Sequence, residues 1–308
     1  MELVQGLPQP INERPTVLTI GAFDGVHLGH QLLIGSTVRR AQALGWQSAV
    51  LTFDPHPNLV IRPDRERLYL ASLDERIEQI AGLGVDLLIV LPFNRDTMAL
   101  TAQEFMTRVC RAIALRELWV GHDFALGRGR EGNLERLRDI GVQLGYGVHP
   151  VEPFLLDGTP VSSTRIRSSL EEGDLLHAAR LLGRPFGLRG QVAEGARRGR
   201  TIGFPTANVA VDSQHMLPAD GVYVCRAQVA GRRYGAVTNV GMRPTFAGAH
   251  RTVEAYLLDF ADDIYGEILR LDFLHRLRGE RKFDGVAALV AQITNDVAAA
   301  RKWLQEAE

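Results

Sequence analysis

The ten residues Gly21-Ala22-Phe23-Asp24-Gly25-Val26-His27-Leu28-Gly29-His30 decide the fold of the first half of this chain. An apolar stretch typical of a short strand, residues 17–23, leads into them, and residues 31–44 carry apolar side chains at helical spacing. Open α/β sheets bind ligands where a strand passes into a helix. The helix N-terminus offers unpaired N–H groups and a positive dipole end, so this turn is predicted to hold an anion.

Two histidines and three glycines give this turn its chemistry. Gly21, Gly25 and Gly29 allow the backbone to approach a phosphate closely. His27 and His30 are three residues apart and share one face if the helix has begun. Such a pair can donate hydrogen bonds to an α-phosphate and offset the charge on departing pyrophosphate. Two alternatives stay open: a turn with two surface histidines, and a metal site whose further ligands are not evident.

Strand-like and helix-like segments continue to alternate up to about residue 183. Further strands are expected at 48–53, 85–91, 118–120 and 147–151, and further helices at 73–83, 102–115, 134–144, 164–171 and 175–182. This alternation is typical of an α/β fold in which helices cover both faces of a parallel sheet.

The sequence changes character after Gly183-Arg184-Pro185. Short β-prone segments, separated by glycine, proline and aspartate, are expected at 187–193, 221–229, 234–240, 252–258 and 268–274, and a closing helix at 283–306. This spacing is typical of a small antiparallel barrel or sandwich. We therefore predict two domains, 1–183 and 184–308.

Composition excludes several classes of protein and partner. The chain has 308 residues, 45% of them hydrophobic and 23% charged, as expected of a globular protein with two cores. A net charge of -1 provides no general attraction to nucleic acid or anionic lipid. Neither a secretory signal nor a membrane-spanning stretch is evident, and the two cysteines do not suggest a disulfide scaffold. We expect a cytoplasmic protein with small-molecule substrates and neither a nucleic-acid nor a membrane partner.

Lysine is nearly absent. Lys282 and Lys302 are the two lysines among 35 basic residues. A P-loop places a lysine on the β- and γ-phosphates, so no P-loop precedes residue 282. Any ATP chemistry in the first half must use histidine, arginine, hydroxyl groups, helix N-termini or a metal.

Residues 21–30 match G-x-F-D-G-x-H-x-G-H, and through this motif the first half resembles a known family. It is similar to the HxGH nucleotidyltransferases, in the form found in bacterial bifunctional riboflavin kinase/FMN adenylyltransferases. Residues 52–57 (TFDPHP), the loop 120–130 and residues 162–167 (SSTRIR) match further signatures of that family. Leu126 departs from it, because a phenylalanine is usual there.

This resemblance implies a Rossmann-like α/β/α nucleotidyltransferase domain. His27, His30 and Arg167 would be its catalytic residues, with Arg167 contacting phosphate from a helix start whose hydroxyls also cap the helix. The residues implied to bind nucleotide or flavin are Gly21, Phe23, Asp24, Gly25, Asp123, Ser163 and Thr164.

The second half carries the stretch 199–208, GRTIGFPTAN. In an extended segment the side chains of Thr206 and Asn208 lie on one face. Their oxygens are hard ligands of the kind that Mg²⁺ accepts together with phosphate oxygens and water. A turn followed by an edge strand with two polar residues is an equally good interpretation of these residues alone.

The stretch 199–208 resembles the riboflavin kinase signature G-R-x-x-G-F-P-T-A-N, and the likeness continues through residues 218–223, 239–245 and 254–266. It implies that Gly203, Thr206 and Asn208 bind nucleotide or flavin, that Thr206 and Asn208 hold Mg²⁺, and that Glu254 is the general base. A cross-strand salt bridge from Glu254 to Arg251 or Arg243 is the alternative. Ala196 departs from the family, where an acidic residue is frequent.

Together the two resemblances imply ATP-dependent phosphorylation of riboflavin to FMN by the second domain, then adenylylation of FMN to FAD with release of pyrophosphate by the first. Mg²⁺ is expected at both sites. Two other hypotheses stay open. In one, the first domain transfers nucleotidyl groups to another acceptor beside a non-catalytic barrel. In the other, the chain is a flavin-binding regulatory protein that has kept the fold.

Overall fold

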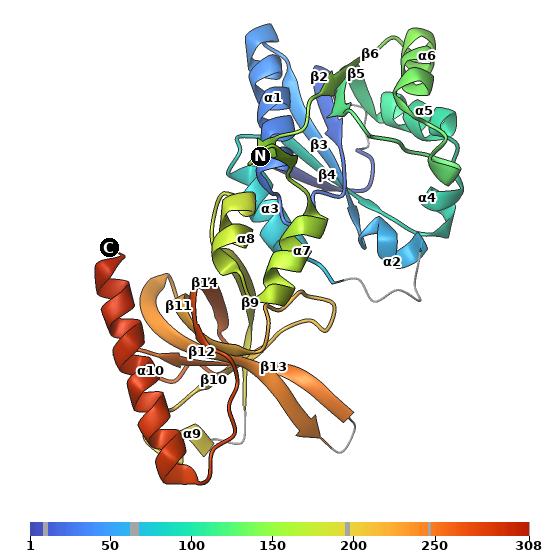
Figure 1. Cartoon of the computed structure of the whole chain (residues 1–308). Coiled ribbons are helices and arrows are strands. Elements are labelled where there is room, and N and C mark those ends of the chain that lie inside the picture. Colours follow the sequence, from blue (N-terminus) through green and yellow to red (C-terminus); the bar gives the residue numbers. More distant parts are fainter. Residues whose placement is uncertain (9–11, 62–67, 195–197, 246–247, 308) are drawn as a thin grey trace. The chain divides into compact units, whose positions relative to one another are not determined.

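The computed structural model describes residues 1–8, 12–61, 68–194, 198–245 and 248–307. Its contacts divide the chain into two compact units, Met1–Ser163 and Thr164–Glu308, which are coloured by sequence in Figure 1. Ala196, one of the two departures from the family signatures, lies outside the described residues.

The first unit is built on a six-stranded parallel sheet with the strand order β1-β4-β3-β2-β5-β6. Its strands are β1 (Glu2–Gln5), β2 (Asn12–Ile20), β3 (Gln47–Asp54), β4 (Leu87–Pro92), β5 (Ile113–Gly121) and β6 (Gly147–Val151). The helices are α1 (Leu28–Leu44), α2 (Pro57–Ile61), α3 (Leu73–Ala81), α4 (Arg95–Ala99), α5 (Ala102–Ala112) and α6 (Leu134–Leu144). A 3-10 turn (Arg128–Arg130) and the two-residue strands β7 (Leu155–Leu156) and β8 (Thr159–Pro160) complete it.

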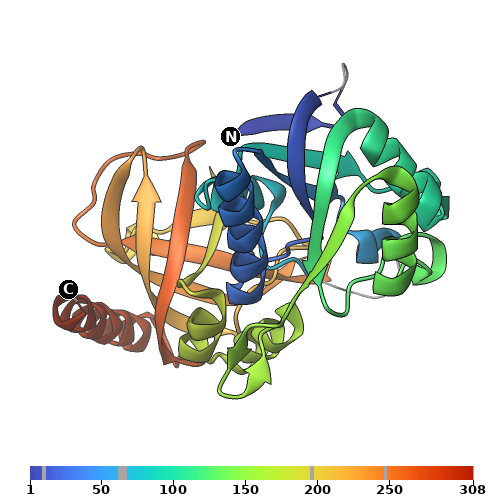
Figure 2. The same cartoon turned by 90° about the horizontal axis from the view of Figure 1, so that it is seen from above.

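Alternate residues of the central strands bury themselves against different helices, as a sheet covered on both faces requires. In β3, Leu51 and Phe53 join the apolar cluster with α5 and α6, whereas Val50 joins the cluster with α1 and α3. The two helical layers are visible in Figure 2. The predicted parallel α/β fold is confirmed.

Several local predictions differ from the structure. The first expected strand, residues 17–23, is β2, and the short elements α2, α4 and β10 were not among the expected helices and strands. β1 was not expected, because it has only four residues and is largely exposed. It extends the sheet by pairing with β4. The helix expected to reach residue 115 ends at Ala112. Ile113 then begins β5, since Ile113 and Leu115 bury their side chains in the sheet. Tertiary burial therefore overrides a helical pattern at this junction.

The second unit is a closed six-stranded barrel with the order β10-β13-β12-β11-β14-β9. Its strands are β9 (Phe186–Ala193), β10 (Ala207–Ala210), β11 (Gly221–Val229), β12 (Arg232–Thr245), β13 (Gly248–Leu257) and β14 (Ile268–Arg278). Its helices are α7 (Ser163–Glu172), α8 (Leu175–Leu182), α9 (Arg198–Thr201) and α10 (Val286–Glu306). Every pairing in the barrel is antiparallel, which confirms the predicted architecture.

The helices α7 and α8 pack with the barrel although they precede the predicted boundary at residue 184. The carbonyl of Leu170 accepts a hydrogen bond from Ala219 N at 2.8 Å, and α8 contacts β9 and β14. The compact units therefore divide near residue 163, while the functional boundary at 183/184 stays a prediction.

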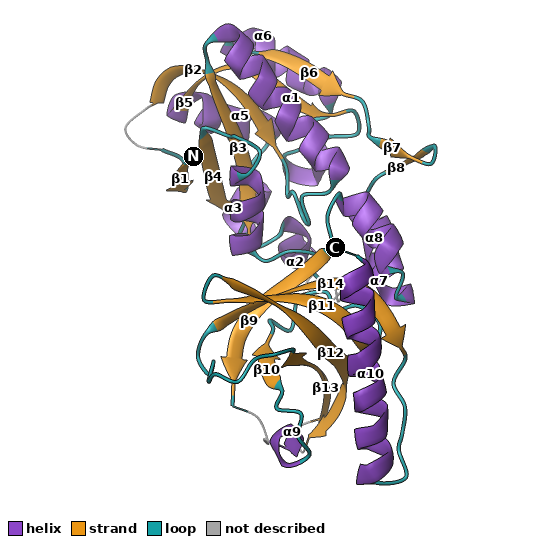
Figure 3. Cartoon of the chain, turned by 90° about the vertical axis from the view of Figure 1, so that its left-hand side faces the viewer, coloured by secondary structure: helices purple, strands orange, loops and turns teal. Residues whose placement is uncertain are grey.

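The helix α10 runs along the outside of the barrel (Figure 3). Its Ala300 belongs to an apolar cluster with Val222, Val224 and Val237 on the outer barrel face. A buried ion pair adds to this contact, because Arg278 of β14 donates three hydrogen bonds of 2.7–3.1 Å to the carboxylate of Asp296.

We expect Asp296→Asn to destabilise the second unit by about 3 kcal/mol, because removing one partner leaves the other charge buried and uncompensated. The matched control is Asp259→Asn, since Asp259 also pairs bidentately with an arginine of α10 but both partners are exposed. Denaturant unfolding should show a much smaller effect for the control. Equal losses for the two variants would contradict this account.

Candidate active sites

The turn between β2 and α1 is tightly curled. Phe23, Gly25 and Val26 have φ values of 50°, 77° and 39°, so two of its non-glycine residues lie in the left-handed region. A Cβ at Gly21 would approach the Phe23 ring to 2.9 Å, which explains the glycine there. Strained backbone of this kind is found where a site needs a defined shape.

His27 and His30 meet as the sequence spacing predicts. His27 is the N-cap of α1, and its Nδ1 accepts a hydrogen bond of 3.3 Å from the backbone N–H of His30. The two imidazole rings stack with centroids 3.6 Å apart, and the Phe23 ring meets His30 edge-on. Since Nδ1 of His27 is an acceptor, a neutral His27 carries its proton on Nε2 and presents it as a donor.

His30 is poised as a neutral group. Burial lowers the pKa of its imidazole well below the ordinary value, and the neighbouring His27 and His56 lower it further. Its Nδ1 is buried and has no hydrogen-bond partner. A buried ring nitrogen without a partner is costly, which makes His30 a candidate to bind a ligand.

Acidification should destabilise the first unit through His30. Unfolded His30 takes up a proton near pH 6.5, whereas folded His30 resists it, so the unfolded state binds more protons and stability falls as pH decreases through that value. Hydrogen exchange of α1 amides between about pH 7.5 and about pH 5.5 should show this loss. His30→Asn should weaken the pH dependence, whereas the matched change at the exposed His122, His122→Asn, should preserve it. An unchanged dependence in His30→Asn would contradict the assignment.

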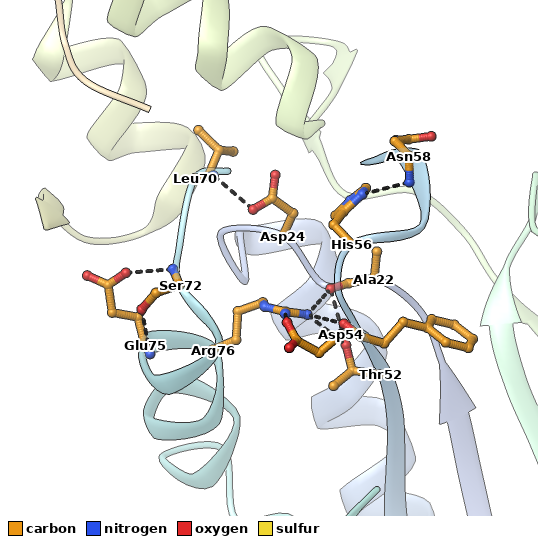
Figure 4. Close-up of polar contacts among 11 residues, drawn as sticks. Ala22, Asp24, Thr52, Asp54, His56, Asn58, Leu70, Ser72, Glu75 and Arg76 are labelled. Atoms are coloured by element: carbon orange, nitrogen blue, oxygen red, sulfur yellow. Dashed lines mark hydrogen bonds and ion pairs between the residues drawn. The ribbon is translucent and has the colours of Figure 1, made fainter. Parts of the chain in front are cut away.

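A buried arginine that the sequence did not single out supports this turn from below (Figure 4). Arg76, 2% exposed, donates from Nη1 to the carbonyls of Ala22 (2.9 Å) and Phe53 (3.1 Å) and to the hydroxyl of Thr52 (3.0 Å). Its Nη2 lies 3.3 Å from Asp54 Oδ1. Burial lowers the pKa of the Arg76 guanidinium, and Asp24 and Asp54 oppose that shift. Arg76 thereby links α3 to the ends of β2 and β3.

Asp24 and Ser163 also shape the turn. Asp24 is 2% exposed, and its Oδ1 accepts from Leu70 N at 2.9 Å, which ties the turn to the segment before α3. The hydroxyl of Ser163 donates to the carbonyl of Asp24 at 3.1 Å. These two predicted binding residues therefore have clear structural contacts, and their contact with a ligand stays a prediction.

The other predicted residues of the first site are spread more widely. Asp123 is exposed, and its carbonyl accepts from Arg130 at 3.1 Å. Leu126 packs against the apolar cluster of α5 and α6, so its side chain contributes to the core. Thr164 and Arg167 lie on α7, which groups with the second unit. Their roles toward the histidine pair stay predictions.

The second site contains a cross-strand pair that the sequence could not establish. β10 and β13 are antiparallel neighbours, and Asn208 stands directly opposite Glu254. The alternative interpretation, a salt bridge from Glu254 to Arg251, is not found in this structure, where Arg251 pairs with Asp220 at 2.7 Å. In the described part of the chain, the Glu254 side chain has neither a hydrogen bond nor an ion pair. The side chain of Arg243 lies outside the described ones.

The glycine-rich stretch before β10 forms a compact turn. α9 occupies Arg198–Thr201, and Gly203 has a φ of 85°, a conformation that favours glycine. Phe204 then packs edge-on against Tyr256 at 5.4 Å. A cavity of about 100 Å³ adjoins this segment and is lined by Pro205, Thr206 and Tyr265, among others.

The oxygen donors of Thr206 and Asn208 fit the chemistry of Mg²⁺, and the unpaired Glu254 carboxylate lies beside Asn208. Among the described residues, no cluster of three or more His, Cys, Asp or Glu side chains could hold a metal. A cation here would therefore need phosphate oxygens and water to complete its coordination.

Comparison with known proteins identifies both units. Residues 9–165 match the family model for FAD synthetase, and residues 182–304 match the one for riboflavin kinase. A bifunctional riboflavin kinase/FMN adenylyltransferase of Pseudomonas fluorescens is 40% identical over 98% of this chain and 97% of its own length. The chain belongs to this family. The Bacillus subtilis and Escherichia coli K12 members are each 36% identical, over 91% and 98% of this chain.

A solved structure is similar to this protein along nearly the whole chain. The crystal structure titled macrolide-efflux protein from Streptococcus pneumoniae has a TM-score of 0.88 and 33% identity, and the match covers 98% of this chain and all of that one. In the described residues, no helix has the length and apolar character needed to cross a bilayer. The predicted order of the two modules is confirmed by the family models.

Proposed function

We propose that this protein makes FAD from riboflavin in two ATP-dependent steps. The second unit transfers the γ-phosphate of ATP to riboflavin and yields FMN and ADP. The first unit transfers the adenylyl group of a second ATP to FMN and yields FAD and pyrophosphate. The observation that carries the proposal is the direct register of Asn208 with an unpaired Glu254, which places a candidate base beside a candidate phosphate site.

In the kinase reaction, the ribityl 5′-hydroxyl attacks the γ-phosphorus of ATP, and the bond to the ADP oxygen breaks. Glu254 accepts the hydroxyl proton in this proposal. Thr206 and Asn208 would hold Mg²⁺, which neutralises charge on the phosphates when bound. Gly203 allows the preceding turn to approach the nucleotide.

In the adenylyltransferase reaction, a phosphate oxygen of FMN attacks the α-phosphorus of ATP, and pyrophosphate leaves. His27 offers an Nε2–H donor, and the neutral His30 offers its ring nitrogens, at the N-terminus of α1 where an anion is stabilised. We also propose that Arg167 contacts phosphate in this reaction. Lysine takes no part, since the first unit contains none.

The decisive experiment incubates the purified protein with riboflavin, ATP and Mg²⁺ and separates the flavins by chromatography. Both FMN and FAD should appear, with ADP and pyrophosphate. The double variant Thr206→Ala/Asn208→Ala should lose FMN formation but still convert supplied FMN to FAD. Failure of the unaltered protein to produce either flavin would overturn the proposal. The cytoplasmic location is a separate prediction that this experiment does not address.

A further inference from the structure

Three neighbouring strands of the barrel carry polar side chains in one row. β13 lies between β10 and β12, and Glu254 is the direct partner of Asn208 on one side and of Asn239 on the other. Directly opposed residues of antiparallel strands have Cβ atoms about 5 Å apart and side chains on the same face. The Glu254 carboxylate therefore lies between two amides, which we call the amide–carboxylate row.

This row points outward. The residues that flank Asn239 and Glu254 along their strands are buried in the barrel: Thr238 and Val240 are 0% exposed, and Val253 and Ala255 are at most 2% exposed. The Asn239 and Glu254 side chains alternate with these and are half-buried on the outer face. Beyond Asn239, the next position in the row is Val222, which α10 covers. Asn239 thus has an apolar neighbour on one side and a carboxylate on the other.

The members of the row do not satisfy one another in this structure. Within the described residues, the side chains of Asn208, Asn239 and Glu254 form no hydrogen bond or ion pair. Half-buried polar groups that lack partners are costly unless a ligand or water pairs them. Catalytic hydrogen bonds are often unformed in the absence of substrate and form in the complex.

We propose that Asn239 is a positioning residue for the kinase reaction: its amide N–H donates to the Glu254 carboxylate and aims that carboxylate at the attacking hydroxyl. Asn208, on the other side of Glu254, keeps its proposed role at the phosphates. The inference rests on the proposed riboflavin kinase activity. A donor at position 239 would fix the direction in which the Glu254 carboxylate oxygens point.

The test measures kcat and KM for FMN formation in the unaltered protein, Asn239→Ala and Asn239→Asp. We expect Asn239→Ala to lower kcat about tenfold with little change in the KM for ATP. Asn239→Asp, which keeps the size of the side chain but has no donor, should lower kcat at least as much. Gln228→Ala is the matched control, because Gln228 faces outward on β11 away from the row.

The outcomes separate the inference from the function on which it rests. If the unaltered protein makes no FMN, the proposed kinase activity fails. If it makes FMN and Asn239→Ala keeps its kcat, the role of Asn239 is refuted. A kcat in Asn239→Asp close to that of the unaltered protein also refutes it, since the size of the side chain and not its donor would then be what the site requires. FAD formation from supplied FMN by the first unit reports in each variant that the chain is folded.

Discussion

Glu254→Gln should lower kcat for FMN formation by about 100-fold or more, because the amide cannot accept the proton of the attacking hydroxyl. The change keeps the size of the side chain. Glu254 has no hydrogen bond or ion pair among the described residues, so folding should be preserved. Steady-state kinetics with riboflavin and ATP measure the effect, and conversion of supplied FMN to FAD should stay at its unaltered rate.

The matched control is Glu267→Gln, an exposed carboxylate on the turn before β14. It should leave both activities unchanged. A Glu254→Gln protein that forms FMN within tenfold of the unaltered rate would show that Glu254 is not the base. The kinase would then depend on positioning and charge neutralisation alone.

Arg76→Met should produce the opposite pattern, with FAD formation greatly reduced and FMN formation retained. The substitution removes the Arg76 donor from the carbonyls of Ala22 and Phe53, and the hydroxyl of Thr52 remains as a donor to Ala22 at 3.2 Å. Unsatisfied buried acceptors cost about 1–3 kcal/mol each. The turn that carries His27 and His30 should relax by enough to lower adenylyltransferase kcat about 100-fold.

Arg76→Lys separates positioning from charge, because lysine keeps the cation but lacks the planar fork of donors. It should recover only part of the lost kcat. Arg39→Met, an exposed arginine on α1, is the control and should behave as the unaltered protein. Full adenylyltransferase activity in Arg76→Met, with a normal unfolding transition, would contradict the role of Arg76.

Much of the fold followed from local patterns. The helices α6 and α8 and the strands β6 and β11 have the predicted bounds, because each combines a clear hydrophobic period with a glycine or aspartate at its end. The exceptions were elements with weak patterns: β1 is short and polar, and β5 begins inside a segment with helical spacing. Both depend on pairing with neighbouring strands, which a single segment does not encode.

The turn from Gly21 to His30 shows what sequence alone determined. His27 and His30 stack because a three-residue spacing at a helix start brings them together, whatever the rest of the fold does. That Thr206 and Asn208 share a face through the period of an extended strand stays a prediction, because β10 begins at Ala207. Long motifs in each half also carried the family resemblance that the comparisons confirmed.

Only the tertiary structure decided which distant residues complete these sites. Arg76 reaches the turn because α3 packs beneath the ends of β2 and β3, and one buried arginine in a helix has no distinguishing sequence signal. Glu254 stands between Asn208 and Asn239 because closure of the barrel sets the register of three strands. A register slip of one residue would turn each side chain to the other face, so this row exists only in the folded barrel.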